Sequence, residues 1–205
     1  MVQSERFWDR LASRYSRTPV SDEAAYQKKL QVTRGYFRPD MEVLEFGCGT
    51  GSTAIVHAPY VKHIRAIDIS SSMIEIAQGK ADAKGIGNVT FAHLSMDELE
   101  LADQTLDVVL GLNILHLLDN WDKTLPRVYN MLKPGGLFVS STACIADMNM
   151  FFRFIASLGN FLLLIPQVSV FSSGELEDSL TGVGFEIDHQ WHPGKNKAVF
   201  IVAKK

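Results

Sequence analysis

The sequence has few of the features that mark secreted, metal-binding or nucleic-acid-binding proteins. Its 205 residues include only two cysteines, Cys48 and Cys144, and neither belongs to a CxxC pair. A disulfide framework or a zinc site is therefore not expected. The formal net charge is −3, which leaves no basic excess to neutralise a phosphate backbone. We expect no metal and no nucleic-acid partner.

The sequence also lacks a recognisable targeting signal and a clear transmembrane segment. Its first ten residues, MVQSERFWDR, contain no apolar core of the kind that signal peptides carry, which predicts a cytoplasmic protein. Residues 154–174 carry no charge, but Asn160, Pro166 and Gln167 interrupt them. Because a membrane span needs about 20 mostly apolar residues, we expect no transmembrane helix. Membrane contact by this stretch stays an alternative.

The sequence does contain an alternation of short β-rich runs and helical patterns, which is typical of an α/β domain with a largely parallel sheet. Five strands are expected at residues 41–46, 64–68, 88–93, 106–112 and 137–142. Helices are expected between them at residues 52–57, 70–84 and 122–132, the last ending at Pro134-Gly135-Gly136. Two further strands, at residues 185–191 and 198–203, are joined by a loop too short for a parallel crossover. They should form a hairpin.

Two other segments are expected to be helical. In residues 1–37, Phe7, Leu11 and Tyr15 recur at intervals of four and predict a cap of N-terminal helices with an apolar face. Residues 143–171 form an apolar insertion, which we interpret as a helical lid over the carboxyl edge of the sheet that lines an acceptor pocket. A dimer interface or a membrane contact are the alternatives for this insertion.

The most informative stretch is VLEFGCGTG, residues 43–51, in which Gly47, Gly49 and Gly51 alternate after an apolar run. Glycine lets the backbone turn sharply and lets a ligand approach it closely. In an open parallel sheet, ligands bind beyond the carboxyl ends of the strands, where the strand order reverses. This loop is therefore predicted to bind a ligand.

A dinucleotide site is the main alternative for this loop. It would need GxGxxG with a pyrophosphate at the helix N-terminus, whereas this loop reads GxGxG and its sixth position is not a glycine. Glu45, two residues before Gly47, would repel a pyrophosphate but suits a cationic ligand. Asp68, at the end of the next strand, can accept hydrogen bonds from both ribose hydroxyls in either case. The loop thus predicts a nucleoside with a positive group and no phosphates.

Five motifs, in the expected order, resemble those of class I S-adenosylmethionine-dependent methyltransferases, especially the small-molecule group with a minimal core. They are VLEFGCGTG, AIDISSSMIEIA, LDVVLGLNILHLL, RVYNMLKPGGLFVSS and the closing pair of strands. The resemblance covers about residues 7–203, except the insertion. It implies a single domain, residues 1–205, with a Rossmann-like three-layer sandwich. The sheet would have seven mostly parallel strands in the order 3-2-1-4-5-7-6, with an antiparallel C-terminal hairpin.

The resemblance also implies the cofactor, S-adenosyl-L-methionine, with S-adenosyl-L-homocysteine as its product and no metal. Gly47, Cys48 and Gly49 would pass close to the methionine part and the ribose, with Glu45 shaping the floor of the loop. Asp68 would hold the ribose hydroxyls. The local sequence leaves an alternative for Asp68, which could instead cap the helix at residues 70–84. Ser70 or Ser72 could also fill that role.

The remaining implied contacts concern the adenine ring and the methionine end. Ile69 and Met73 would cover the adenine face. Ser95 stands where the family often has an acidic residue for the adenine amino group, and the Met96 backbone N–H could meet the ring. Asn113, just after the fourth strand, would reach the methionine end. The remaining contact comes from the N-terminal helix, on which Tyr15 would close over the cofactor.

No catalytic residue follows from the sequence. His116 is a candidate general base, because its ordinary pKa is near neutrality, and a residue without a catalytic role is the alternative. The family's NPPY-type motif for nucleic-acid bases is absent, because Asn113 is followed by Ile114-Leu115. We expect a methyltransferase, monomeric or homodimeric, that acts on a small apolar or aromatic acceptor by in-line transfer. An NAD-dependent oxidoreductase and a non-catalytic cofactor-binding domain are the alternatives.

Overall fold

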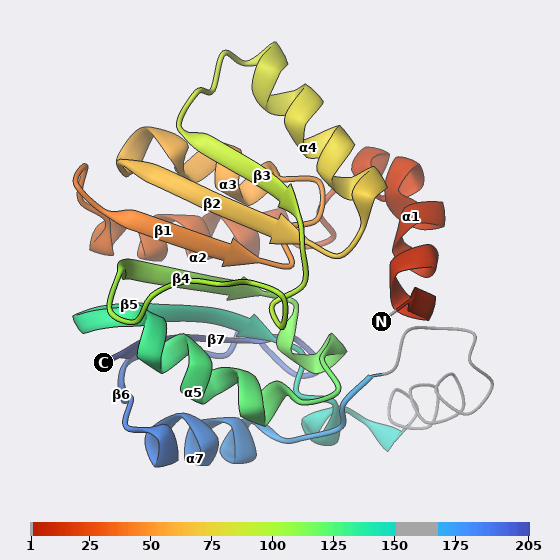
Figure 1. Cartoon of the computed structure of the whole chain (residues 1–205). Helices are drawn as coiled ribbons and strands as arrows, with labels where there is room; N and C mark the ends of the chain where they lie inside the picture. Colours follow the sequence, from red (N-terminus) through yellow and green to blue (C-terminus); the bar gives the residue numbers. More distant parts are fainter. Residues whose placement is uncertain (1, 151–167) are drawn as a thin grey trace. The chain divides into compact units, whose positions relative to one another are not determined.

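The computed structural model describes residues 2–150 and 168–205 (Figure 1). The chain forms two compact units, Met1–Glu100 and Leu101–Lys205. Residues 151–167, which include most of the predicted helical lid, lie outside the described residues. In the described part of the chain, no helix is long and apolar enough to cross a membrane.

The first unit is built on three parallel strands. Its elements are α1 (Val2–Arg17), α2 (Glu23–Tyr36), β1 (Glu42–Phe46), α3 (Ser52–His57), β2 (His63–Asp68), α4 (Ser71–Ala83) and β3 (Val89–His93). Strand β2 pairs in parallel with β1 on one side and with β3 on the other, and Asp68 lies opposite His93. The carboxyl ends of the three strands therefore meet at one edge, where a ligand is expected.

Small and apolar side chains explain how helix α4 packs in this unit. The side chains of Ala77 and Ala81 on α4 are fully buried, as are Leu44 and Ile64 in the strands. Because alanine projects little from a helix, α4 can lie close to β2 and β3, which it contacts. Helix α1 packs in turn against α4 (Figure 1). This packing places α1 beside the start of α4, directly after β2.

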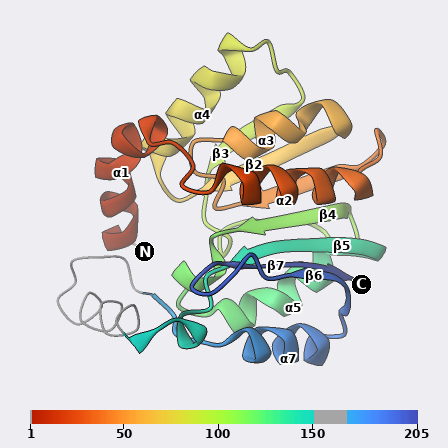
Figure 2. The same cartoon turned by 180° about the vertical axis from the view of Figure 1, so that it is seen from behind.

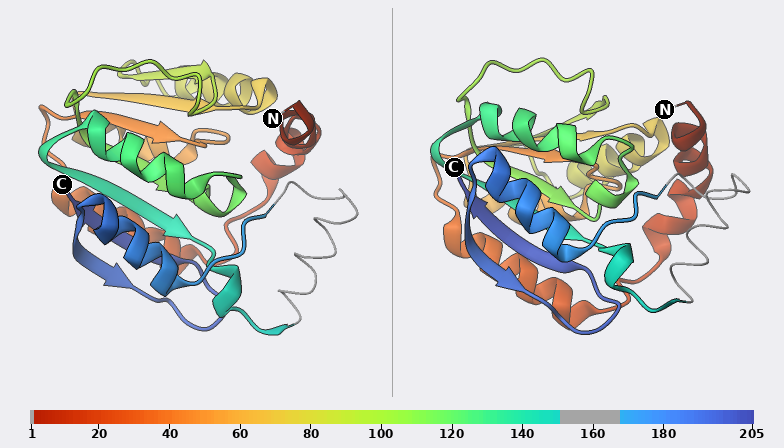
Figure 3. Two further views of the ribbon diagram at one scale, coloured as in Figure 1. Left: turned by 60° about the horizontal axis from the view of Figure 1, so that its bottom comes forward. Right: turned by 90° about the horizontal axis from the view of Figure 1, so that it is seen from below.

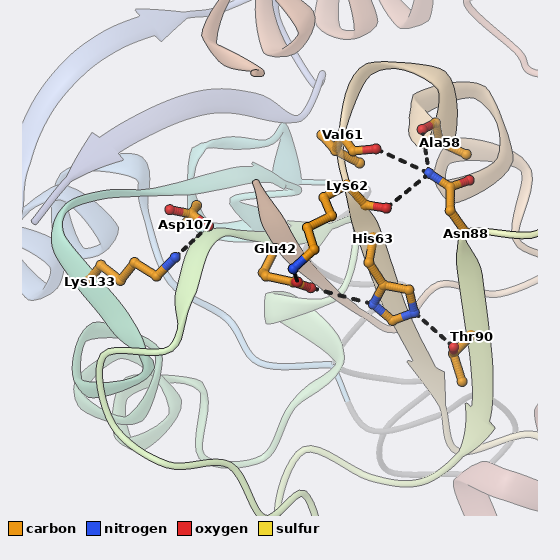
Figure 4. Close-up of polar contacts among 9 residues, drawn as sticks. All are labelled: Glu42, Ala58, Val61, Lys62, His63, Asn88, Thr90, Asp107 and Lys133. Carbon is orange, nitrogen blue, oxygen red and sulfur yellow. Dashed lines mark hydrogen bonds and ion pairs between the residues drawn. The ribbon is translucent and has the colours of Figure 1, made fainter. Parts of the chain in front are cut away.

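Polar contacts fasten the opposite, amino-terminal ends of these strands (Figure 4). The Asn88 side-chain amide donates to the carbonyl oxygens of Ala58 and Val61 at 2.8 and 3.1 Å. The Lys62 ammonium lies 2.7 Å from the Glu42 carboxylate, and both side chains are partly exposed. These contacts help to set the register of β1, β2 and β3 without using the residues at the carboxyl edge.

The second unit contains the remaining strands. Its elements are β4 (Leu106–Leu112), α5 (Trp121–Met131), β5 (Leu132–Thr142), α7 (Ser173–Val183), β6 (Glu186–Trp191) and β7 (Val199–Lys204), with short 3-10 turns at Leu115–Leu117 and Ile145–Asp147. Strand β4 pairs in parallel with β5, whereas β7 pairs antiparallel with β5 and β6 (Figure 2). Helices α5 and α7 lie side by side (Figure 3). The predicted C-terminal hairpin is therefore confirmed.

The seven strands follow the order β3-β2-β1-β4-β5-β7-β6 in one mixed sheet. The expected fold class, a Rossmann-like sheet with an antiparallel C-terminal hairpin, is confirmed. Several predicted bounds, among them residues 106–112 and 52–57, match the observed elements.

Other predicted bounds differ from the structure by a residue or so, and the start of β5 differs most. The helix predicted at residues 122–132 ends at Met131, and β5 begins at Leu132 and runs through Pro134-Gly135-Gly136. The reason is a pairing with the last residue of the chain. The amide N–H of Gly135 donates to the Lys205 carbonyl, and the Lys205 amide donates to the Gly136 carbonyl, both at 2.9 Å.

Candidate cofactor site

The loop after β1 has the conformation that its glycines permit. Gly47, Gly49 and Gly51 all have positive φ, at 66°, 52° and 70°, a region that side chains with a Cβ rarely enter. The Cys48 amide N–H donates to the Ile67 carbonyl at 3.0 Å, which ties the loop to β2. The alternating left-handed residues turn the chain from β1 into α3.

Gly51 is also required by packing. A Cβ on this residue would lie 2.7 Å from the Cβ of Ala77 on α4 and 2.7 Å from the Phe91 ring on β3. Both distances are shorter than side chains tolerate. The third glycine of the GxGxG motif therefore lets α4 and β3 approach the loop closely, the role that the third glycine of a dinucleotide motif plays elsewhere.

Asp68 lies directly beside this loop. Its Oδ2 accepts a hydrogen bond from the Gly49 amide at 2.8 Å, and its Oδ1 accepts one from the Ser70 amide at 2.9 Å. Ser70 is the N-cap of α4 and accepts from the Met73 amide, so neither Asp68 nor Ser72 caps this helix. Burial raises the pKa of Asp68, and the two amide hydrogen bonds oppose that effect. Each oxygen keeps a lone pair for a further donor.

Glu45, in β1 two residues before Gly47, is almost completely inaccessible, with 3% of its surface exposed. Among the described residues, its Oε2 has no hydrogen-bond partner. Burial, and secondarily the Asp68 carboxylate, raise the pKa of Glu45 to about 8. Two carboxyl groups thus share a buried site beside the glycine loop, an environment that a positive charge would stabilise.

Helix α1 covers part of this loop. Cε1 of Tyr15 would lie 3.9 Å from a Cβ on Gly49, and 51% of Tyr15 is exposed. Burial, followed by Asp68 and Glu45, raises the pKa of its hydroxyl. The Asp9 carboxylate on the same helix accepts from the Ser70 hydroxyl at 2.6 Å and from the Ser72 amide at 3.2 Å. Asp9 thereby attaches α1 to the start of α4.

Two residues that support the loop were not singled out from the sequence. The Lys80 ammonium on α4 donates to the carbonyl and hydroxyl of Thr50, at 3.2 and 2.8 Å, and to the Ser52 hydroxyl at 3.2 Å. The Tyr26 hydroxyl on α2 lies 3.2 Å from the hydroxyl of Thr53. Both contacts join segments about 30 residues apart, so no local sequence pattern reports them.

The residues predicted to surround the adenine are close to the strand ends but differ in accessibility. Ile69 is partly exposed, and its carbonyl oxygen lies 2.9 Å from Nε2 of His93. Met73 is only 2% exposed, and Met96 is also buried. The Ser95 hydroxyl donates to the Glu98 carboxylate at 2.7 Å and accepts from the Glu98 amide at 3.2 Å. The predicted adenine contact of Ser95 would therefore use its remaining lone pair.

Comparisons with known proteins show a similarity to methyltransferases. Residues 43–136 match the family model described as a methyltransferase domain. Over this segment the chain is similar to methyltransferases. The matched segment begins at the strand that leads into the glycine loop and ends at Gly136 in β5. A crystal structure of an S-adenosylmethionine-dependent methyltransferase from Mesorhizobium loti is among the similar ones, and the described residues hold no group of three or more side chains that could bind a metal ion.

Several individual relatives agree with this assignment. The uncharacterized methyltransferase YcgJ of Bacillus subtilis is 29% identical over 110 residues, which are 54% of this chain and 44% of that protein. A ubiquinone/menaquinone biosynthesis C-methyltransferase, UbiE of Vibrio campbellii, is 33% identical over 113 residues, 53% of this chain and 44% of the relative. The chain thus spans about half the length of these curated relatives. The crystal structure of YcgJ aligns with a TM-score of 0.69 at 24% identity, covering 80% of this chain and 72% of that one.

The second unit contains the other predicted site residues. Asn113 follows β4 with a positive φ of 58°. Its amide donates to the Ser141 carbonyl at 2.6 Å, and its Oδ1 lies 3.4 Å from the Ser141 hydroxyl. His116 lies in the following turn, and burial lowers its pKa to about 4. Both residues are in the segment beyond the carboxyl end of β4.

Proposed function

We propose that this chain binds S-adenosyl-L-methionine and transfers its methyl group to a small, apolar or aromatic acceptor. The observation that carries the proposal is the left-handed glycine loop with two buried carboxyl groups, Glu45 and Asp68, beside it. Asp68 would accept hydrogen bonds from the ribose hydroxyls, and Glu45 would face the positive methionine end. Tyr15 would cover the bound donor from α1.

The same arrangement opposes a dinucleotide. A pyrophosphate would meet the buried Asp68 carboxylate, where charge repulsion is strong, and the Glu45 carboxyl would offer it no positive charge. Helix α3 has only six residues, so it offers little dipole to an anion. The Lys80 ammonium directs three hydrogen bonds to Thr50 and Ser52, which are as many as it has donors. The nearby cation therefore serves the loop and is not free for a phosphate.

Methyl transfer needs little chemistry from the protein itself. The acceptor attacks the methyl carbon in line, the carbon–sulfur bond breaks, and the positive sulfonium leaves as a neutral thioether. Aligning the two reactants can lower the barrier by about 7–11 kcal/mol. His116 is neutral at pH 7 because its pKa is lowered to about 4, and so low a pKa makes it a weak base. We therefore propose that orientation contributes more than proton removal.

The acceptor class rests on sequence and on relatives. The apolar insertion at residues 143–171 carries the aromatic and aliphatic side chains that an apolar acceptor would need. Relatives include a demethylmenaquinone methyltransferase and a malonyl-[acyl-carrier protein] O-methyltransferase, whose acceptors differ. We propose a small-molecule acceptor without nucleic acid, and a monomer or homodimer as the acting species.

Calorimetric titration of the protein with S-adenosylmethionine, S-adenosylhomocysteine and NAD tests the donor assignment. We expect both sulfur compounds to bind and NAD to bind much more weakly or not at all. Tight binding of NAD without binding of the sulfur compounds would contradict the proposal. Methyl transfer to any member of a panel of quinol, phenol and acyl acceptors would separate an enzyme from a domain that only binds the cofactor.

Removing the Asp68 carboxylate tests the ribose contact. We expect Asp68→Ala to weaken S-adenosylhomocysteine binding by about 1–3 kcal/mol, because charge-assisted hydrogen bonds are lost. Asp82→Ala, at the last turn of α4 where the side chain accepts from Gln78, is the control and should leave the affinity unchanged. Equal affinities of the two variants would contradict the predicted contact between Asp68 and the ribose.

A further inference from the structure

No contact among the described residues explains the burial of Glu45. It lies near the carboxyl end of β1, just before the glycine loop, with 3% of its surface exposed. Among the described residues, its Oε2 accepts no hydrogen bond. An ionised carboxylate in such a place costs several kcal/mol unless a positive charge or hydrogen-bond donors accompany it. The empty site therefore favours a neutral, protonated Glu45.

The titratable groups of this unit that interact electrostatically with Glu45 come from four parts of the chain. They are the Asp68 carboxyl on β2, the Tyr15 hydroxyl on α1, the Tyr26 hydroxyl on α2 and the Cys48 thiol in the loop. None of these four groups is basic. Each of them disfavours a negative charge on Glu45 or is indifferent to it, so these four groups of the described chain supply no counterion.

The two carboxyl groups differ in how they are solvated. Asp68 accepts two backbone hydrogen bonds, from Gly49 and Ser70, and His93 also lowers its pKa electrostatically. Hydrogen bonds to the charged form favour ionisation. Glu45 keeps an oxygen without a partner, and burial followed by Asp68 raises its pKa to about 8. When the pair shares one proton, that proton belongs mainly on Glu45.

We infer that Glu45 carries a proton while the donor site is empty and gives it up when the positively charged methionine end of the donor binds. This inference rests on the proposed function, because it takes S-adenosylmethionine as the ligand. In the step, the O–H bond of Glu45 breaks, the proton passes to a buffer base, and the resulting carboxylate pairs with the ligand's positive group. No electrons are exchanged.

Donor affinity is then linked to pH with a defined sign. Below about pH 8 a proton must be removed before the pair forms, so affinity should rise about tenfold per pH unit between about pH 6 and 7.5. Above the pKa of Glu45 in the empty site, affinity should level off. Glu45 thereby selects ligands by charge, because a neutral nucleoside gains nothing from its ionisation.

Proton release can be counted directly. Titrations at about pH 6.5 in buffers of different ionisation enthalpy give the number of protons released per ligand, which we expect to be about one for S-adenosylmethionine. S-adenosylhomocysteine keeps the ammonium but lacks the sulfonium, and 5′-methylthioadenosine lacks both. Release with the first two ligands assigns the ammonium as the partner of Glu45, and release with S-adenosylmethionine alone assigns the sulfonium. The neutral nucleoside should release none.

Matched variants complete the test. Glu45→Gln resembles the protonated side chain in shape, so it should fold, bind the donor more weakly and release no proton. Glu42→Gln removes a carboxylate from the same strand, one that is partly exposed and paired with Lys62, and should release as many protons as the native protein. Donor binding without proton release by the native protein, or with unchanged release by Glu45→Gln, would overturn the inference. Absence of any donor binding would instead contradict the proposed function.

Discussion

His57 illustrates how a single residue can limit the stability of the fold. Its side chain is fully buried at the end of α3, and neither ring nitrogen has a partner among the described residues. The ring lies edge-on against Phe37, with ring centroids 4.9 Å apart. Burial, followed by the positive charge of Arg34, lowers its pKa to about 3. The folded protein therefore holds His57 in its neutral form.

This burial predicts a specific sensitivity to acid. The ordinary pKa of histidine is 6.5, so below that pH the unfolded chain takes up a proton that the folded chain excludes. The contribution of His57 to the free energy of unfolding should fall by about 1.4 kcal/mol per pH unit from about pH 6 towards pH 3. We expect His57→Leu to remove this slope in urea unfolding measured at several pH values.

The control for His57 is His192→Gln, at an exposed position after β6, which should keep the native pH dependence. His116 also has a lowered pKa, so the difference between variant and native protein carries the test, not the absolute slope. If His57→Leu and the native protein lost stability in parallel on acidification, the neutral state of His57 would not be what limits acid stability.

Among the elements, those whose ends are set by local sequence are the ones that could be predicted. The buried apolar run at residues 106–112 and the glycine loop before residues 52–57 both fall where expected. The Pro134-Gly135-Gly136 boundary did not, because its backbone pairs with Lys205 at the far end of the chain. The Lys205 side chain also donates to the carbonyl oxygens of Tyr129 and Leu132, at 2.6 and 2.8 Å. Contacts with residues so far along the chain cannot be predicted from the local sequence.

The glycines of α4 and its neighbouring loop provide a paired prediction. Gly51→Ala would place a Cβ in contact with Ala77 and Phe91 at a residue with positive φ, so we expect a loss of stability of about 2–5 kcal/mol and weaker donor binding. Gly79→Ala, inside α4 with nothing within 4 Å of its Cβ, should raise stability by about 0.5–1 kcal/mol. Thermal and urea unfolding of both variants measures the difference. A tolerated Gly51→Ala would show that α4 and β3 do not enclose the loop.

The residues that would contact the ligand could be predicted from the sequence, whereas the residues that hold the loop and helices in place could not. Glycine spacing and the acidic residues Glu45 and Asp68 could be read from neighbouring strands and loops. Asp9 could not, because its hydrogen bond to Ser70 joins residues 61 positions apart and depends on how α1 packs on α4. Lys80 could not be predicted either, because its hydrogen bonds to Thr50 and Ser52 are also non-local.

For the whole molecule, strand order and family agree. In a sheet of order β3-β2-β1-β4-β5-β7-β6 the glycine loop follows β1, and the family model matches residues 43–136, which include this loop. The segment that should decide the acceptor, residues 151–167, lies outside the described residues. We propose that the acidic glycine loop binds the donor. That the apolar insertion lines the acceptor site stays a prediction from the sequence.

A crystal structure of the protein with S-adenosylhomocysteine tests the central claim most directly. We predict ribose hydroxyls within about 2.7–3.2 Å of the Asp68 carboxylate and the amino-acid end next to Glu45, beneath the loop from Gly47 to Gly49. The Tyr15 ring should cover the ligand. Density for the ligand away from this loop, or a ribose that does not reach Asp68, would contradict the assignment of the donor site.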